Sequence, residues 1–437
     1  MTDKKNYRIS FALITVLFFF LGFITVLVDS LIPRLRELFE LTYFQAGMVQ
    51  FAFFSAYFLL SIPSSFIINK IGYKGGIISG LSTLALGCLL FYPAAEFRSF
   101  GIFILGYFTL AGGMTLLQVA INPFVAVLGH EKSASGRLTL AQAFNSLGTA
   151  IAPIVGATLI LSDKIKSKNE ISQLSENAQQ VYLAGEASAV QFPFVWIALM
   201  IGAVAAIFIF ISLPKLIHTN SSGTYFSLFK KKNLMLGVMG IFFYVGAEVA
   251  IGSYLVNYFL DMNLVPLIKS NETMRYITEV ILNSDLKIND QKAVVGVFVA
   301  FYWTGAMVGR FFGSYLLKKI NPGLAIAIFA FFAIQLIVVS ISTNGLISMW
   351  AILAVGLCNS IMFPTIFTLA IGGLKELKPK ASGLLCMAIV GGAMIPPMFG
   401  YLTDLSGFKT ALTLIVCCYI YISFFGYYNF KLISKGK

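Results

Sequence analysis

Charged residues are scarce in this chain: Asp, Glu, Lys and Arg together make up 11% of its 437 residues, whereas 58% are hydrophobic. Soluble domains carry roughly 25% charged residues. The composition therefore excludes an ordinary soluble domain and indicates an integral membrane protein. The mean hydropathy of +0.86 agrees with this interpretation.

Groups suited to catalysis are also few. Histidine occurs only at His130 and His218, and no Ser/His/Asp set falls within an apolar stretch. The chain lacks the GxxxxGK(S/T) loop that cradles nucleotide phosphates. Its cysteines show no metal-ligand spacing. We therefore expect neither an enzyme nor nucleotide-driven transport, and we predict no metal site and no cofactor.

The chain does contain a series of long apolar stretches. A spanning helix needs about 20 apolar residues. Stretches of this kind occur over about 9–31, 44–68, 75–95, 99–128, 139–161, 192–212, 234–260, 293–317, 323–343, 346–372, 382–402 and 409–430. The predicted fold class is an all-α membrane protein, with twelve transmembrane helices in two pseudo-symmetric six-helix bundles.

The net charge is +13. The distribution of the basic residues indicates a membrane topology rather than nucleic-acid binding. If both termini lie on one side of the membrane, most of the 31 Lys and Arg residues fall on that side. Short loops rich in Lys and Arg face the cytoplasm. Both termini are therefore expected in the cytoplasm, and no nucleic acid is expected as a partner.

The longest cytoplasmic link divides the chain into two sets of six spans. We predict an N-terminal bundle over 1–212, a linker over 213–233 and a C-terminal bundle over 234–437. Corresponding positions of the fifth and eleventh spans carry the same residues: Gly148 and Gly392, Pro153 and Pro397, Gly156 and Gly400. Many transporters consist of two such related halves.

Proline is expected to interrupt the fourth span of each half, at Pro123 and at Pro364. Interrupted helices free backbone groups, which membranes tolerate beside cavities or packed neighbours. The alternative is ordinary kinking, because proline is common in spanning helices. Its occurrence at corresponding places in both halves favours a repeat.

Only two acidic residues fall inside the apolar stretches, Asp29 in the first span and Glu248 in the seventh. A charged side chain at membrane depth is costly, so it usually faces a cavity and marks an ion or substrate route. We predict that both carboxylates couple transport to a cation. For Asp29, which lies near the end of its span, the alternative is a carboxylate that caps the helix or reaches solvent.

Amide side chains cluster on the fourth and fifth spans, at Gln118, Asn122, Gln142 and Asn145. Residues three or four apart share one face of a helix, and an amide both donates and accepts hydrogen bonds, which suits a sugar hydroxyl. We predict that these amides bind the sugar that the family resemblance described below implies. The alternative is that the amides bond neighbouring helices, at about 0.6 kcal/mol each.

Basic loops follow the second span of each half. They contain Lys70 and Lys74 in the first half and Arg310 in the second, and Arg137 precedes the fifth span. We predict that these four cations form a cytoplasmic gate by meeting helix C-terminal ends. The alternative is a plain topological anchor. Loops of this kind resemble the signature of the major facilitator superfamily.

Four segments carry a more specific resemblance, over Val26–Pro33, Leu117–Gly129, Arg137–Gly148 and Tyr244–Leu255. Together they closely resemble the fucose/glucose-galactose symporter branch of that superfamily, and the resemblance extends over nearly the whole chain. It implies a cation-coupled monosaccharide importer that works by alternating access. It also implies that Asp29 matches the family's proton-linked aspartate.

The branch members differ at informative positions. The fucose symporter type has glutamate at the position of Gln118, glutamine at that of Glu248, and a Gln-Tyr pair where Met362 and Phe363 stand. The combination of Gln118 and Glu248 in this chain looks more like the glucose/galactose branch. We therefore expect a glucose/galactose-type hexose, with Phe363 at the site and Tyr254 and Asn257 lining the external vestibule.

Several alternatives stay open at this point. The substrate can be L-fucose or N-acetylglucosamine instead, the coupled ion can be H+ or Na+, and a non-transporting sugar sensor is the alternative from a different class. We expect a monomer embedded in the lipid bilayer of a bacterial inner membrane.

Overall fold

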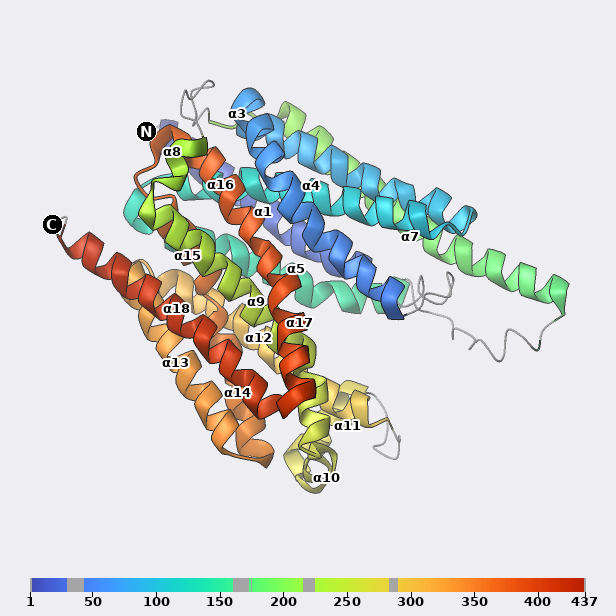
Figure 1. Ribbon diagram of the computed structural model, residues 1–437. Helices are drawn as coiled ribbons and strands as arrows, with labels where there is room; N and C mark the ends of the chain where they lie inside the picture. Colours follow the sequence, from blue (N-terminus) through green and yellow to red (C-terminus); the bar gives the residue numbers. More distant parts are fainter. Residues whose placement is uncertain are drawn as a thin grey trace. The chain divides into compact units, whose positions relative to one another are not determined.

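The computed structural model describes residues 2–29, 43–159, 173, 175–214, 225–282 and 290–435. Every regular element in these ranges is a helix (Figure 1). Among the described residues, 10 helical stretches are long and apolar enough to cross a membrane. The prediction of an all-α membrane protein is therefore confirmed.

Contacts between residues divide the chain into two compact units. Unit 1 consists of Met1–Glu131, Phe144–Lys230 and Gly373–Ala388, and unit 2 consists of Lys132–Ala143, Lys231–Gly372 and Ile389–Lys437. Each unit therefore takes in one short segment, 132–143 or 373–388, from the opposite predicted half. The predicted boundary at the linker therefore does not account for these two segments.

Unit 1 is built mainly from long apolar helices. It contains α1 (Thr2–Asp29), α3 (Tyr43–Glu96), α4 (Phe100–Val127), most of α5 (Ala134–Leu159), α7 (Glu176–Phe210), α8 (Tyr225–Phe229), η2 (Lys375–Leu377) and α16 (Lys378–Met387). The short turn η1 (Glu131–Ser133) precedes α5. In this unit α3 packs closely against α4 and α7, and α16 packs against α3 and α4.

Helix α3 is 54 residues long. At 1.5 Å per residue it would measure about 80 Å, more than twice the roughly 30 Å of a hydrocarbon core. It bends at Gly72, where φ is 77° and ψ is 174°. This backbone region is essentially restricted to glycine, because a Cβ atom would clash there. Gly72 therefore separates the predicted spans 44–68 and 75–95.

Unit 2 contains the remaining helices. They are α9 (Lys232–Asp261), α10 (Leu264–Ser270), α11 (Glu272–Leu282), α12 (Gln291–Leu316), α13 (Pro322–Ser342), α14 (Gly345–Asn359), α15 (Met362–Ala370), η3 (Ala388–Val390), α17 (Gly391–Ser406) and α18 (Phe408–Lys435). Helix α9 contacts α12, α15, α17 and α18. The side chains of α9 that face these helices therefore lie in the interior of the unit.

The two prolines expected to interrupt spans behave differently. Pro123 lies inside the continuous helix α4, whereas the tenth span is broken into α14 and α15 at residues 360–361, just before Pro364. Proline lacks the N–H that would bond the carbonyl four residues earlier, and in α4 that carbonyl, Val119 O, accepts a 2.9 Å hydrogen bond from the Ser382 hydroxyl. The prediction that Pro123 interrupts the fourth span is therefore wrong. The helix stays continuous, and Ser382 of α16 donates the hydrogen bond that the Val119 carbonyl would otherwise lack.

Candidate functional site

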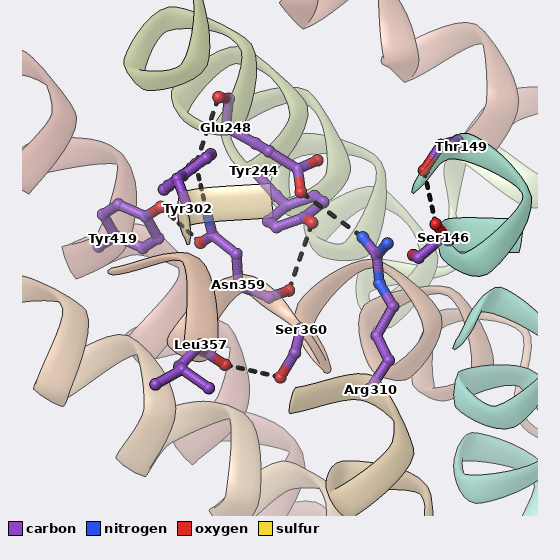
Figure 2. A network of polar contacts seen from close by, with 10 residues as sticks. All are labelled: Ser146, Thr149, Tyr244, Glu248, Tyr302, Arg310, Leu357, Asn359, Ser360 and Tyr419. Carbon is purple, nitrogen blue, oxygen red and sulfur yellow. Dashed lines mark hydrogen bonds and ion pairs between the residues drawn. The ribbon is translucent and has the colours of Figure 1, made fainter. Parts of the chain in front are cut away.

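A buried ion pair lies inside unit 2. Arg310 Nη2, from α12, lies 3.6 Å from Glu248 Oε1, from α9 (Figure 2). The side chains are only 16% and 14% exposed. Removing charges from water is costly unless each meets an opposite charge or hydrogen bonds. The sequence predicts Arg310 as part of a cytoplasmic gate and gives no sign of this pairing.

Three buried tyrosines and one asparagine surround the ion pair (Figure 2). The Asn359 side-chain nitrogen donates to the Tyr302 hydroxyl at 2.7 Å, and the Tyr419 hydroxyl donates to Asn359 Oδ1 at 2.6 Å. The Tyr302 hydroxyl in turn donates to the main-chain carbonyl of Glu248 at 3.3 Å. The asparagine side chain therefore links α12 and α18 to the backbone that carries Glu248.

Tyr244 completes this network. It lies one helical turn before Glu248 in α9, so the two side chains share a face. The Tyr244 hydroxyl donates to the main-chain carbonyl of Asn359 at 3.3 Å. Tyr244, Tyr302, Asn359 and Tyr419 are each at most 1% exposed. A buried polar network holds its side chains in one arrangement when its polar atoms have hydrogen-bond partners.

In unit 1, the predicted amides of α4 contact other helices. Gln118 Nε2 donates to the Tyr57 hydroxyl in α3 at 2.9 Å. Asn122, in the same helix, is fully buried. The Gln118 contact ties α4 to α3, as the packing interpretation of these amides requires.

The two amides of α5 fall in different units. Asn145 belongs to unit 1, and its side-chain nitrogen donates to the carbonyl of Phe18 in α1 at 2.9 Å. Gln142 is half-buried and belongs to unit 2. The contacts of Gln118 and Asn145 thus lead to different helices, α3 and α1.

Two of the other three predicted gate cations contact nearby groups. Lys74 Nζ donates to the carbonyl of Ile209 in α7 at 2.8 Å, Lys70 is exposed, and the Arg137 guanidinium donates to the Ser133 hydroxyl. The contact of Lys74 with a carbonyl at the end of α7 is of the kind predicted from helix C-terminal ends.

The predicted substrate-site residues of the second half lie in unit 2. Phe363, in α15, has its ring centroid 6.4 Å from that of Tyr244, so it borders the buried network. Tyr254 packs at 5.2 Å on Phe399 of α17, and Asn257 is exposed. Asp29 is the last residue of α1, and its side chain lies outside the described residues.

An apolar cavity lies within unit 1. It is lined by hydrophobic side chains only, from Leu17, Phe20, Leu21, Ile24, Leu81, Leu84, Leu117, Met200, Ile201 and Val204. A sugar would leave its hydroxyls without partners there. This cavity therefore does not suit a sugar.

Sequence reasoning found Glu248 but not the groups that hold it. Asn359 and Ser360 are adjacent polar residues inside a predicted span, and Tyr244 precedes Glu248 by one helical turn. Polar residues within a membrane are costly and usually functional, so the Asn359-Ser360 pair was an available signal. The pairing with Arg310 has no comparable signal, because it joins two helices far apart in the chain.

Comparisons with known proteins agree over nearly the whole chain. The model of the Major Facilitator Superfamily matches residues 13–397. The glucose/galactose transporter of Brucella abortus biovar 1 (strain 9-941) is 42% identical over 428 residues, which cover 97% of this chain and 95% of that protein. The L-fucose-proton symporter of Escherichia coli (strain K12) is 33% identical over 433 residues, which cover 97% of this chain and 93% of that one.

A solved structure matches as closely. The crystal structure of FucP, a transporter of the same superfamily in the outward conformation, has a TM-score of 0.85 at 31% identity. The match covers 97% of this chain and 99% of that one. The chain therefore belongs to the Major Facilitator Superfamily.

Proposed function

We propose that this protein is a secondary active importer of a glucose/galactose-type hexose, coupled to protons and working by alternating access. The observation that carries the proposal is the buried pair of Glu248 and Arg310, in a chain 42% identical over nearly its full length to a protein named as a glucose/galactose transporter. An ionisable pair at membrane depth marks an ion or substrate route.

The neighbourhood of Glu248 favours a proton over a sodium ion as the coupled cation. A sodium ion on the carboxylate would lie close to the Arg310 guanidinium, 3.6 Å from Glu248 Oε1, and like charges at such distances repel strongly away from bulk water. A proton instead neutralises the carboxylate without bringing a second full charge to the site. We assign Asp29 as the second proton-coupling carboxylate, from its place in the first span.

Sugar recognition is assigned to amides and aromatic rings. Among the amides, Gln118, Gln142 and Asn145 are half-buried, which suits groups that meet a solute. Asn122 is fully buried and would support the site from within the helices. Phe363 borders the Glu248 network and offers a ring face to the sugar.

The topology proposed with this function has twelve spans and both termini in the cytoplasm. Two spans add to the 10 long apolar stretches of the described residues. Helix α3 is one of these stretches but contributes two spans because it bends at Gly72, and α5, with 26 residues, contributes one more. We place the protein in the inner membrane of a bacterium, as a monomer.

Transport by the purified protein in liposomes tests the proposal. Labelled glucose or galactose should accumulate when the outside is acidified, and a sodium gradient alone should drive no accumulation. Competition by unlabelled glucose, galactose, mannose, L-fucose and N-acetylglucosamine identifies the substrate. No counterflow of any of these sugars would reject the function. Accumulation driven by sodium would reject the proton.

Two variants test the site itself. Asp29→Asn should abolish gradient-driven uptake but leave some sugar exchange, and full concentrative transport would remove Asp29 from the mechanism. Gln142→Ala should weaken sugar binding measured by calorimetry, and unchanged affinity would return this residue to helix packing.

L-Fucose is the second candidate substrate. The 33% identity to the L-fucose-proton symporter of Escherichia coli favours it. Three positions oppose it, because the fucose symporter type has glutamate, glutamine and tyrosine where this chain has Gln118, Glu248 and Phe363. Stronger competition by L-fucose than by glucose would select this alternative.

A further inference from the structure

A tryptophan lies along the same face of α12 as the arginine of the buried ion pair. The side chain of Trp303 is 47% exposed. Arg310 follows it by seven residues, or about two helical turns, so the two side chains project from one face of the helix. This face of unit 2 therefore carries a large, partly exposed aromatic ring as well as a charge.

The indole of Trp303 packs directly on Gly252 of α9. A Cβ atom added to Gly252 would lie 2.5 Å from Trp303 Cζ2 and 3.2 Å from Cη2. Both atoms belong to the six-membered ring, which thus fills the space that a side chain at position 252 would take. Gly252 follows Glu248 by four residues, so the two share a face of α9. The ring therefore covers α9 one turn beyond Glu248.

The face shared by these residues does not point at lipid tails. Glu248 and Arg310 pair across the contact of α9 with α12, and both side chains keep a small exposed fraction (Figure 2). Charged side chains in a membrane face the interior of the bundle or a water-filled cavity, because hydrocarbon disfavours them. Trp303 lies on the Arg310 face of α12 and over the Glu248 face of α9. Its exposed part therefore borders the same space.

Another tryptophan of unit 2 has different surroundings. Trp350, on α14, contacts Phe298 and Phe301 of α12 edge-on, with ring centroids 6.1 and 5.5 Å apart. Phe301 precedes Trp303 by two residues, which at about 100° per residue places it on the opposite side of α12. Trp350 therefore packs in an aromatic cluster on the far side of α12 from the ion pair.

A sugar ring needs two kinds of contact. The hydroxyls around its rim need hydrogen-bond donors and acceptors, and the C–H groups on its two faces need an apolar surface. An indole offers a broad apolar face and one N–H donor. The guanidinium of Arg310 donates hydrogen bonds, and the carboxylate of Glu248 accepts them. One helical turn rises about 5.4 Å, which is close to the width of a pyranose ring.

We propose that Trp303 is the residue on which the sugar ring stacks, and that Gly252 is required to seat its indole. The pyranose lies with one C–H face against the indole, and the hydroxyls at one edge of the ring point toward Glu248 and Arg310. This inference rests on the proposed function and deepens it, because it names the group that recognises the ring of the substrate.

Sugar binding by the purified protein tests the stacking. Binding of D-glucose and of D-galactose is measured by calorimetry. Trp303→Leu removes the ring and should lower affinity by about twofold to tenfold, the range expected for one aromatic contact. Trp303→Phe keeps a smaller ring without the N–H and should recover part of the loss. Trp350→Leu is the matched control and should keep wild-type affinity, because its ring lies on the other side of α12.

Gly252→Ala tests the seat of the indole while leaving the tryptophan in place. Its Cβ would lie 2.5 Å from the ring, so the indole must move, and affinity should fall by about twofold to tenfold. Adding Trp303→Leu should cause no further loss, because non-additivity identifies residues that act together. Gly296→Ala is the control: on α12, an added Cβ has no described atom within 4 Å, and affinity should not change.

Tryptophan fluorescence gives a readout that a ring with only a structural role would not change. Adding either sugar should alter the emission of the wild-type protein and of Trp350→Leu. The same addition should leave the emission of Trp303→Leu unaltered, because the ring that meets the sugar is gone. A sugar-dependent signal that persists in Trp303→Leu would contradict the stacking.

The outcomes separate the two proposals. Wild-type affinity in Trp303→Leu, or in Gly252→Ala if Trp303→Leu does not fold, would overturn the stacking and leave Trp303 as an interface anchor of the kind common in membrane proteins. The sugar transporter would stand. Absence of both binding and counterflow of either sugar in the wild-type protein would overturn the proposed function, and the stacking with it.

Discussion

Replacing Arg310 with methionine tests the strength of the ion pair with Glu248. Methionine keeps a long side chain for packing but removes the charge. At 3.6 Å and an effective dielectric constant of about 20, two unit charges attract by about 4–5 kcal/mol. Removing one partner of a buried pair typically costs about 3–5 kcal/mol, because the other charge stays buried without compensation. We therefore expect Arg310→Met to destabilise the protein by about 3–5 kcal/mol.

The assay is unfolding of purified protein in detergent, followed by tryptophan fluorescence. Arg275→Met is the matched control, because Arg275 pairs with Glu279 at 4.0 Å with side chains 52% and 37% exposed. Exposed pairs contribute about 0.2–1 kcal/mol. Adding Glu248→Gln to Arg310→Met should recover much of the lost stability, because no unpaired charge remains. Equal stability of Arg310→Met and Arg275→Met, or no recovery in the double variant, would refute the reasoning.

Two further predictions concern the backbone of unit 1. Gly72→Ala should lower the free energy of unfolding by about 1–3 kcal/mol, because φ of 77° and ψ of 174° strain any residue with a Cβ. Gly202→Ala is its control: this glycine lies in α7, and no neighbour lies near the added carbon. The control should be neutral or slightly stabilising in the same unfolding assay. Ser382→Ala leaves the buried carbonyl of Val119 without its 2.9 Å donor and should cost about 1–3 kcal/mol, whereas Ser406→Ala, on an exposed hydroxyl, should cost little. Equal effects within either pair would contradict the corresponding argument.

The sequence was sufficient to predict the class of fold and the residue at the centre of the candidate site. Apolar stretches of helical length follow directly from the cost of exposing polar backbone to lipid. Glu248 was conspicuous because a carboxylate inside such a stretch is rare. Both inferences depend on local composition, which a sequence displays without knowledge of tertiary contacts.

The partners of Glu248 could not be predicted in the same way. Arg310 is 62 positions away in the chain, and its place near the end of a span looks like a topological anchor. Tyr302 and Tyr419 are aromatic residues in apolar helices, where tyrosine is common. Only the packing of α9 against α12 and α18 gives their hydroxyls a shared role.

The repeat in the sequence extends to contacts that its glycines and prolines did not reveal. The tripeptide Ala-Ser-Gly occurs at 134–136, at the start of α5, and at 381–383, in α16. In unit 2, the Ser135 hydroxyl is hydrogen-bonded to that of Thr368 at 2.7 Å. In unit 1, Ser382 donates to a carbonyl of α4, and α4 is the counterpart of the broken span that carries Thr368.

The glycines of the two tripeptides have matching surroundings. A Cβ atom at Gly136 would lie 2.8 Å from the Ser314 carbonyl oxygen of α12, and one at Gly383 would lie 2.9 Å from the Ser61 carbonyl oxygen of α3. Real Cβ atoms do not approach so closely, so both positions require glycine for close packing of helices. Ser61 belongs to the second span of the first half, and Ser314 to the second span of the second half. Corresponding residues therefore dock on corresponding helices in both units, which is why the segments 132–143 and 373–388 change units together.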